Sequence, residues 1–221
     1  MNRTKIEWCD YTWNPVTGCK TGCWYCFAQR MATRFHRSFE PAFHPERLNE
    51  PLRVTTPAKI FVCSTADLFG PWIEQQWQRR VFQICAAAAW HTFLFLTKWP
   101  NEMANTGETF PLDAWAGLTL TGEVPSLDAR KLALFEQVEA PHFLSFEPLL
   151  GPPPDLNLWN IEWVIVGAYT GAGAKQHAPS AAWIDPILDA AARYEIPVFM
   201  KNNLRPYWPG ELRQEWPEEL R

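Results

Sequence analysis

The chain has 221 residues, of which 47% are hydrophobic and 20% are charged, and its formal net charge is −4. This composition is typical of a globular protein and excludes a disordered chain, and no apolar run is long enough to predict a membrane span. The segment Met1 to Trp8 lacks the apolar core of a signal peptide, so we expect a cytoplasmic protein whose thiols stay reduced.

Charge is distributed unevenly along the sequence. Residues 1–58 hold eight Lys/Arg and five Asp/Glu, a net of +3, whereas the remainder holds twelve and nineteen, a net of −7. A basic first third is typical of a protein that faces a phosphate-bearing substrate, although a solvated surface gives the same composition.

Seven short runs rich in β-branched and aromatic residues predict strands. Most are continuously apolar, which is typical of strands covered on both faces by helices. The runs are Thr12 to Val16, a weak strand ended by Pro15, then Lys59 to Ser64, Thr92 to Thr97, Trp115 to Thr119, His142 to Phe146, Trp163 to Gly167 and Pro197 to Lys201.

Helical patterns alternate with these strands. They span Phe27 to Arg37, Pro71 to Trp90, Val124 to Val138 and Ala181 to Tyr194. This alternation predicts an α/β fold with about six to seven parallel strands in a partial or full (β/α) barrel, forming a single domain over residues 1–221. The segment 148–160 contains three consecutive prolines, so we expect no crossover helix there.

Polar residues follow several of the predicted strands, where parallel α/β folds bind ligands. We therefore expect a shared site at the carboxyl ends of the strands. The candidates are Ser64, Thr65, Asp67, Thr97, Lys98, Thr119, Ser145, Glu147, Gly167 to Thr170, Lys201 and Asn202.

The most specific pattern is the spacing C-x3-C-x2-C formed by Cys19, Cys23 and Cys26, with Gly18 and Gly22 beside them. Three thiolates on a glycine-bearing loop predict a 4Fe–4S cluster with one iron free of protein ligands. S-adenosylmethionine (SAM) chelates such an open iron through its amino and carboxylate groups. The three cysteines are thus candidate cluster ligands and catalytic residues.

Zinc is the main alternative for these cysteines, with Cys9 or His36 as the fourth ligand. Separated C-x2-C pairs are more typical of zinc, and this sequence has only one close pair plus a third cysteine. Cys63 and Cys85 have no comparable spacing and are expected in the core, although Cys63 near a strand end is also a candidate hydrogen-atom donor.

The motifs resemble a small phage-associated radical SAM family that is largely of unknown function. The resemblance rests on IEWCDYTWNPVTGC, HPERL, STADLFG, FLFLTKWP, SFEPLLGP and WVIVG, in this order from about Lys5 to Lys201. Two features depart from the family pattern. The spacing between the first two cysteines is compact, and Gly167-Ala168-Tyr169-Thr170 replaces the usual GGES.

Membership of this family implies reductive cleavage of SAM to methionine and a 5′-deoxyadenosyl radical, which abstracts hydrogen from the substrate. It implies a one-electron donor of the flavodoxin or ferredoxin type, in a bacterial or phage-infected cell. Tyr25 occupies the usual aromatic position of the radical SAM signature. By the same analogy SAM contacts Ser64, Asp67, Thr97, Lys98, Ser145 and Glu147.

Within these contacts Lys98 is expected to pair with the carboxylate of SAM, and Glu147 or Asp67 to accept bonds from ribose hydroxyls or the amino group. A solvated lysine at a helix start and an ion pair at the barrel rim are the structural alternatives for Lys98 and Glu147.

The predicted substrate is a nucleic-acid base or a modified thymidine nucleotide, with an isomerase among the reactions considered. The basic first third and the family's phage context favour it, as do Arg30, Arg34 and Arg37, which recur on one face of a predicted helix. Two alternatives remain: a radical SAM enzyme acting on a small metabolite or peptide, and a non-enzymatic metal-stapled domain that binds nucleic acid.

Overall fold

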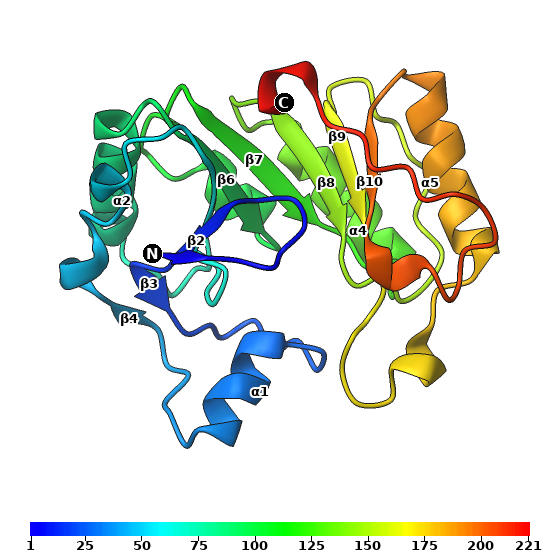
Figure 1. Cartoon of the computed structure of the whole chain (residues 1–221), viewed down its shortest axis with the longest axis horizontal. Helices are drawn as coiled ribbons and strands as arrows, with labels where there is room; N and C mark the ends of the chain where they lie inside the picture. Colours follow the sequence, from blue (N-terminus) through cyan, green and yellow to red (C-terminus); the bar gives the residue numbers. More distant parts are fainter. The chain divides into compact units, whose positions relative to one another are not determined.

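The main element of the protein is an eight-stranded, mostly parallel sheet (Figure 1), seen in a computed structural model that describes residues 1–221. The strand order is β1-β2-β5-β6-β7-β8-β9-β10. The strands are β1 (Asn2–Arg3), β2 (Tyr11–Trp13), β5 (Lys59–Val62), β6 (Thr92–Thr97), β7 (Ala114–Thr119), β8 (His142–Phe146), β9 (Trp163–Val166) and β10 (Val198–Met200). A separate antiparallel pair consists of β3 (Val16–Thr17) and β4 (Ala42–Phe43).

The chain also contains five α-helices and five short 3-10 helices. The α-helices are α1 (Phe27–Arg34), α2 (Gln75–Ala87), α3 (Pro100–Ala104), α4 (Pro125–Phe135) and α5 (Ala181–Arg193). The 3-10 helices are η1 (Pro45–Arg47), η2 (Pro51–Arg53), η3 (Ala174–His177), η4 (Asn202–Leu204) and η5 (Glu218–Leu220). None of the helices has both the length and the apolar character needed to cross a membrane.

The chain forms two compact units. The first contains residues 1–116 and 138–140, and the second contains residues 117–137 and 141–221.

The first unit is built on parallel strands with apolar side chains. β2 pairs with β5, and β5 pairs with β6, both in parallel register. Ile60, Phe93 and Leu94 are fully buried in these strands, and α2 buries Val81, Phe82 and Cys85 along one face. A continuous apolar core of this kind holds the carboxyl ends of β5 and β6 in fixed positions, which is what a site at those ends requires.

The second unit has the same construction. β8 pairs with β9 and β9 with β10, again in parallel register. α5 buries Ile184, Ile187 and two alanines on one side. Residues 148–160 contain no helix, as the three prolines predict.

All seven predicted strands are present, and the mostly parallel α/β sheet confirms the predicted fold class. Strand β1 was not expected, because its two residues carry no alternation that the sequence reveals. Helix α3 was also missed, since five residues are too few to show a helical period.

The predicted helix over residues 71–90 is too long. Glu74 takes the N-cap position with an extended backbone, so α2 begins at Gln75 and leaves Trp72 and Ile73 in the preceding turn.

Candidate active site

The cysteine loop lies between β3 and α1 and begins alongside the segment that follows β5. The backbone N–H of Gly18 donates to the carbonyl of Thr65 at 3.1 Å, and Gly18 forms a parallel bridge with Ala66. The N–H of Cys19 donates to the carbonyl of Phe39 at 3.1 Å. Backbone hydrogen bonds therefore fix the loop at its first cysteine and at the residue before it.

Two glycines give the loop its path. Gly18 has φ = 82° and Gly22 has φ = 75°, in the left-handed region that side chains with a Cβ rarely adopt. A Cβ at Gly18 would collide with the backbone carbonyl of Glu40, whereas a Cβ at Gly22 would meet nothing within 4 Å.

This difference predicts that Gly18→Ala disrupts the cysteine loop and Gly22→Ala does not. Gly22→Ala carries only the backbone strain, about 1–2 kcal/mol. Gly18→Ala adds a clash with the backbone of Glu40, which would have to move. We therefore expect the Gly18→Ala variant to lose most of its iron after reconstitution and the Gly22→Ala variant to keep its iron. Iron assays on the two variants test this, and equal iron contents would contradict it.

The three thiols are free and partly buried, and two of the sulfurs accept backbone hydrogen bonds. Thr21 N–H donates to Cys19 Sγ at 3.5 Å, and Gln29 N–H donates to Cys26 Sγ at 3.3 Å. Cys26 is the N-cap residue of α1, so its sulfur faces the amino end of a helix, where negative charge is stabilised.

The end of β6 forms the second support of the loop. Trp99 Nε1 donates to Thr21 Oγ1 at 3.2 Å, and Lys98 Nζ lies 5.7 Å from the centroid of the Tyr25 ring. The ammonium group of Lys98 therefore lies over the aromatic residue directly before the third cysteine.

Asp67 joins the ends of β5 and β6 from a buried position. Its Oδ1 accepts a bond from Thr97 Oγ1 at 2.7 Å and from Phe69 N–H at 3.2 Å, and its Oδ2 accepts one from Lys98 N–H at 2.9 Å. Burial raises the pKa of this carboxyl, although the three hydrogen bonds oppose the rise. Asp67 and Thr97 thus fix the backbone that carries Lys98.

Ser64 lies in a second set of contacts, centred on Asn14. The Asn14 Oδ1 atom accepts bonds from Ser64 Oγ at 3.2 Å, from Thr65 N–H at 3.1 Å and from Thr65 Oγ1 at 3.1 Å. Asn14 follows β2, so it ties the end of that strand to the loop after β5. No periodic pattern in the sequence points to this residue.

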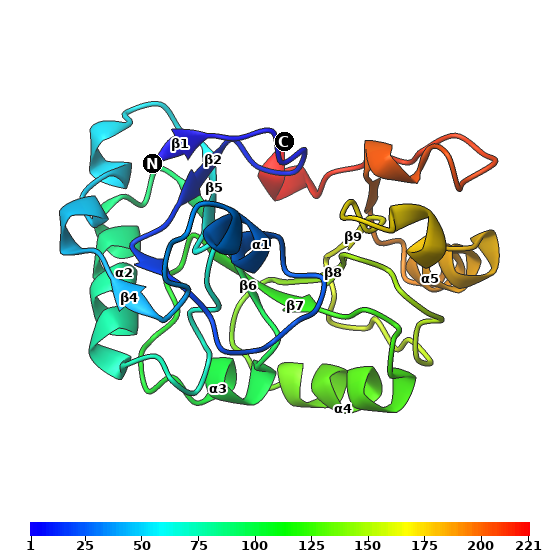
Figure 2. The same ribbon diagram turned by 90° about the horizontal axis from the view of Figure 1, so that it is seen from below.

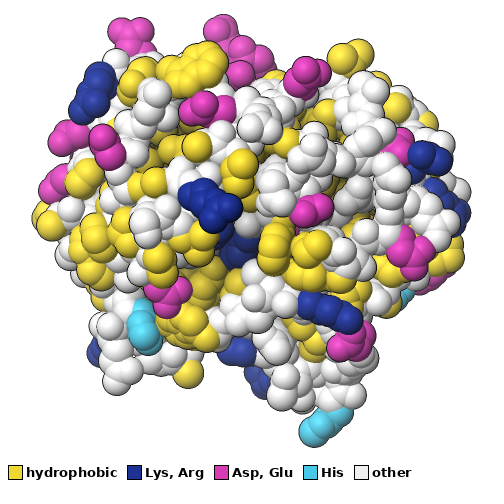
Figure 3. Space-filling view, turned by 180° about the vertical axis from the view of Figure 1, so that it is seen from behind, with side chains coloured by type: hydrophobic (Ala, Val, Ile, Leu, Met, Phe, Trp, Pro, Cys, Tyr) yellow, Lys and Arg dark blue, Asp and Glu magenta, His cyan; other side chains and the backbone are white.

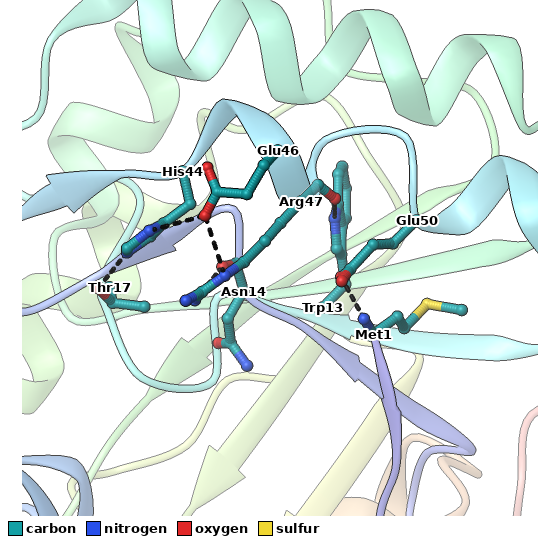
Figure 4. A network of polar contacts seen from close by, with 8 residues as sticks. All are labelled: Met1, Trp13, Asn14, Thr17, His44, Glu46, Arg47 and Glu50. Carbon is teal, nitrogen blue, oxygen red and sulfur yellow. Dashed lines mark hydrogen bonds and ion pairs between the residues drawn. The ribbon is translucent and has the colours of Figure 1, made fainter.

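The HPERL segment, residues 44–48, supports the end of β2 (Figure 4). Trp13 Nε1 donates to the carbonyl of Arg47 at 2.8 Å, and Arg47 donates to the carbonyl of Asn14 at 3.3 Å. His44 contacts Thr17 Oγ1 through Nε2 at 2.8 Å and Glu46 through Nδ1 at 3.3 Å. Since Thr17 directly precedes Gly18, the segment holds the start of the cysteine loop.

The remaining residues predicted to contact SAM, Ser145 and Glu147, belong to the second unit. Ser145 is fully buried at the end of β8, and its hydroxyl has no hydrogen-bond partner in the protein. The Glu147 carboxylate forms an ion pair with Lys201, at the end of β10. Their predicted contacts with SAM stay predictions.

The segment Gly167 to Thr170, which replaces the GGES usual in the family, is also in the second unit. Ala168 exchanges two backbone hydrogen bonds with the Asn203 side chain, at 3.0 and 2.8 Å. Tyr169 is buried and packs edge-to-face on His177, with ring centroids 5.8 Å apart. These contacts give Ala168 and Tyr169 a structural role.

The other three cysteines are core residues, as the sequence predicts for Cys63 and Cys85. Cys9, Cys63 and Cys85 are all buried. Burial raises the pKa of the Cys63 thiol to about 12, so this group stays protonated. The candidate cluster ligands are therefore Cys19, Cys23 and Cys26 alone.

The donor set fits an iron–sulfur cluster better than zinc. Nowhere in residues 1–221 do three or more His, Cys, Asp or Glu side chains converge as ligands of one metal ion. Tetrahedral zinc needs four such ligands, at about 2.0–2.3 Å from a single point. A cubane binds each cysteine through a different iron, so it suits three thiols spread along one loop with backbone donors to sulfur.

Basic side chains do not form one continuous patch on the face shown in Figure 3. Acidic and basic groups are interspersed there among hydrophobic ones. The charge excess of residues 1–58 therefore does not by itself define a nucleic-acid surface on this face.

The site is thus a three-cysteine loop held against the segments that follow β5 and β6 in a mostly parallel α/β fold. Six solved chains of spore photoproduct lyase match the structure, and at 8–11% sequence identity this likeness shows a shared fold. A mutant with dinucleoside spore photoproduct has a TM-score of 0.62 and 9% identity, and the match covers 90% of this chain and 78% of that one. A double mutant with bound AdoMet and dinucleoside spore photoproduct has a TM-score of 0.59, 9% identity and the same two coverages.

Another mutant has a TM-score of 0.55 and 11% identity, and there the match covers 79% of this chain and only 61% of the lyase chain. No curated protein sequence matches. The profile of the family described as "Protein of unknown function (DUF5131)" matches residues 3–208, and the chain belongs to this family.

Proposed function

We propose that this protein is a radical SAM enzyme that acts on a nucleic-acid base or a modified thymidine nucleotide. The observation that carries the proposal is the three-cysteine loop, fixed against the carboxyl ends of β5 and β6 with Lys98 beside it. Cys19, Cys23 and Cys26 would hold a 4Fe–4S cluster. When bound, the cluster supplies the electron that cleaves SAM into methionine and a 5′-deoxyadenosyl radical.

The residues of the first unit would bind and orient SAM. Lys98 offers a positive charge to its carboxylate, and Tyr25 supplies a ring face beneath that charge. Asp67 and Thr97 act behind Lys98, since their hydrogen bonds hold its backbone and the adjoining turn.

The pairing of Lys98 with SAM predicts weaker binding in Lys98→Ala. Loss of a charge-assisted hydrogen bond should cost roughly 1–3 kcal/mol of SAM binding free energy, and Lys98→Arg should recover part of it. Equilibrium dialysis of SAM against the reconstituted protein measures the change. Lys5→Ala, at an exposed position, is the control. Unchanged affinity in Lys98→Ala would remove Lys98 from the SAM site.

The substrate class is supported by the likeness to spore photoproduct lyase structures that hold a dinucleoside spore photoproduct. The basic composition of residues 1–58 is consistent with a phosphate-bearing substrate. A base within a duplex is shielded, so the enzyme would act on a flipped base, a single strand or a free nucleotide.

Product analysis tests the proposal. The anaerobic protein, dithionite and SAM should release 5′-deoxyadenosine, and the release should rise when a thymine-containing oligonucleotide or an irradiated one is added. Mass spectrometry of the DNA would show the modified base. If no oligonucleotide or nucleotide stimulates SAM cleavage, a small metabolite or peptide becomes the preferred substrate class.

A further inference from the structure

One face of α1 is apolar and uncovered. The helix buries none of its residues, and Phe27, Met31 and Phe35 have exposed fractions of 61%, 37% and 54%. Their four-residue spacing places all three on one side of the helix. Figure 1 shows α1 standing clear of the strands of its own unit, and in Figure 2, seen from below, the helix lies in front of them. Side chains of this size in water indicate a surface that a partner covers.

A basic stripe runs beside this apolar face. It consists of Arg30, Arg34 and Arg37, and no acidic residue occurs between Tyr25 and Phe39. Arg34 and Arg37 form no ion pair. Instead, their guanidinium carbons lie 5.8 and 5.9 Å from the centroid of the Phe35 ring. Arg34 and Arg37 are thus not neutralised by a neighbouring helix, and their charge is available to an acidic partner.

The same helix begins at a cluster ligand. Cys26 is its N-cap residue. At 1.5 Å per residue, the eight residues of α1 span about 12 Å. A partner seated on Phe27, Met31 and Phe35 therefore lies close to a cluster bound by the cysteine loop.

We propose that this face of α1 docks an acidic one-electron carrier protein with a flavin or iron–sulfur centre. The inference rests on the proposed function, which needs an external electron. One electron passes from the carrier, which is oxidised, to the cluster, which is reduced, and no bond forms or breaks. The arginines draw the acidic carrier to the surface, and the aromatic and Met side chains provide the apolar contact typical of interface centres.

Nucleic acid fits this surface less well. Bases bind to such surfaces by stacking on open aromatic faces. Two guanidinium groups already lie over the Phe35 ring, and Met31, between the two phenylalanines, has no ring to stack on.

The double variant Arg34→Glu/Arg37→Glu tests the proposal, with reduced flavodoxin as the carrier and dithionite as a donor that needs no docking. At limiting flavodoxin, the rate of 5′-deoxyadenosine release should fall at least about tenfold, whereas the dithionite-driven rate should stay within about twofold of wild type. The flavodoxin-driven rate of the wild type should also fall as salt rises. Phe35→Ser removes apolar contact without changing charge, and it should weaken the flavodoxin-driven rate only.

Binding provides a readout that does not depend on activity. Flavodoxin should protect residues 24–37 of the wild type from hydrogen exchange, and it should not protect them in the double variant. The matched control is Arg130→Glu/Arg193→Glu, which reverses two exposed arginines of the second unit. Absence of SAM cleavage even with dithionite would refute the proposed function while leaving this binding test intact.

Three results would overturn the docking proposal. One is a flavodoxin-driven rate that falls no further in the α1 variant than in the control. Another is loss of oligonucleotide binding with an unchanged flavodoxin-driven rate, which would assign the face to nucleic acid. The third is a homodimer in sedimentation that the α1 variant dissociates.

Discussion

Replacing Cys23 with alanine should remove most of the iron and sulfide from the anaerobically reconstituted protein and abolish the release of 5′-deoxyadenosine. The wild type should hold about four irons and four sulfides per chain. Each thiolate would bond a different iron, so the loss of one leaves one iron of the cluster without its protein ligand. Iron and sulfide assays, together with chromatography of the SAM products, measure the effect. Cys19→Ala and Cys26→Ala should behave in the same way.

Cys85→Ala is the matched control for a lost thiol. Cys85 is buried on the apolar face of α2, so its truncation should cost roughly 1–2 kcal/mol of stability and leave the iron content unchanged. A colourless wild-type protein with one zinc per chain would contradict the cluster. That result would favour the alternative function, a non-enzymatic metal-stapled domain that binds nucleic acid.

The strands were predictable because their side chains are buried on both faces. Runs such as Thr92 to Thr97 and Trp163 to Val166 are apolar throughout, which leaves little choice but a covered parallel strand. Two-residue β1 and five-residue α3 escaped prediction, because segments this short show no period. The start of α2 was misplaced because Trp72 and Ile73 continue the helical spacing across a turn.

The candidate site was predictable where chemistry and spacing coincide. The cysteine motif stands out in the sequence, and the strand-end rule selected Asp67, Thr97 and Lys98, which the structure brings together. The contact of Trp99 with Thr21 and the role of Asn14 were not predictable. Both join segments distant in sequence, and a single Asn or Trp carries no sign of such a contact.

The uncovered face of α1 is another feature that could not be predicted from the sequence. The sequence predicts the helix and the arginine spacing, and an apolar stripe on a helix normally indicates core. Only the structure shows that Phe27, Met31 and Phe35 remain exposed.

Asp67→Ala should lower the free energy of unfolding by roughly 2–5 kcal/mol, because it leaves three donors without their acceptor in a buried position. These donors belong to Phe69, Thr97 and Lys98. The lysine should consequently lose its fixed position, so the variant should also bind SAM more weakly. Urea unfolding measures the stability. Asp113→Ala, at an exposed position, should stay within about 0.5 kcal/mol of wild type.

The stability contributed by Asp67 should also depend on pH, with a defined sign. Burial raises the pKa of its carboxyl above the ordinary value of 3.8, so the folded protein keeps this proton to higher pH than the unfolded chain does. The contribution is therefore fully present below pH 3.8 and is lost as the pH rises through the pKa of the folded state. Asparagine at this position does not titrate. The stability advantage of the wild type over Asp67→Asn should accordingly shrink as the pH rises from about 4 to neutrality. An advantage that grows over this range would mean that the three hydrogen bonds outweigh burial and hold the pKa of the carboxyl below its ordinary value.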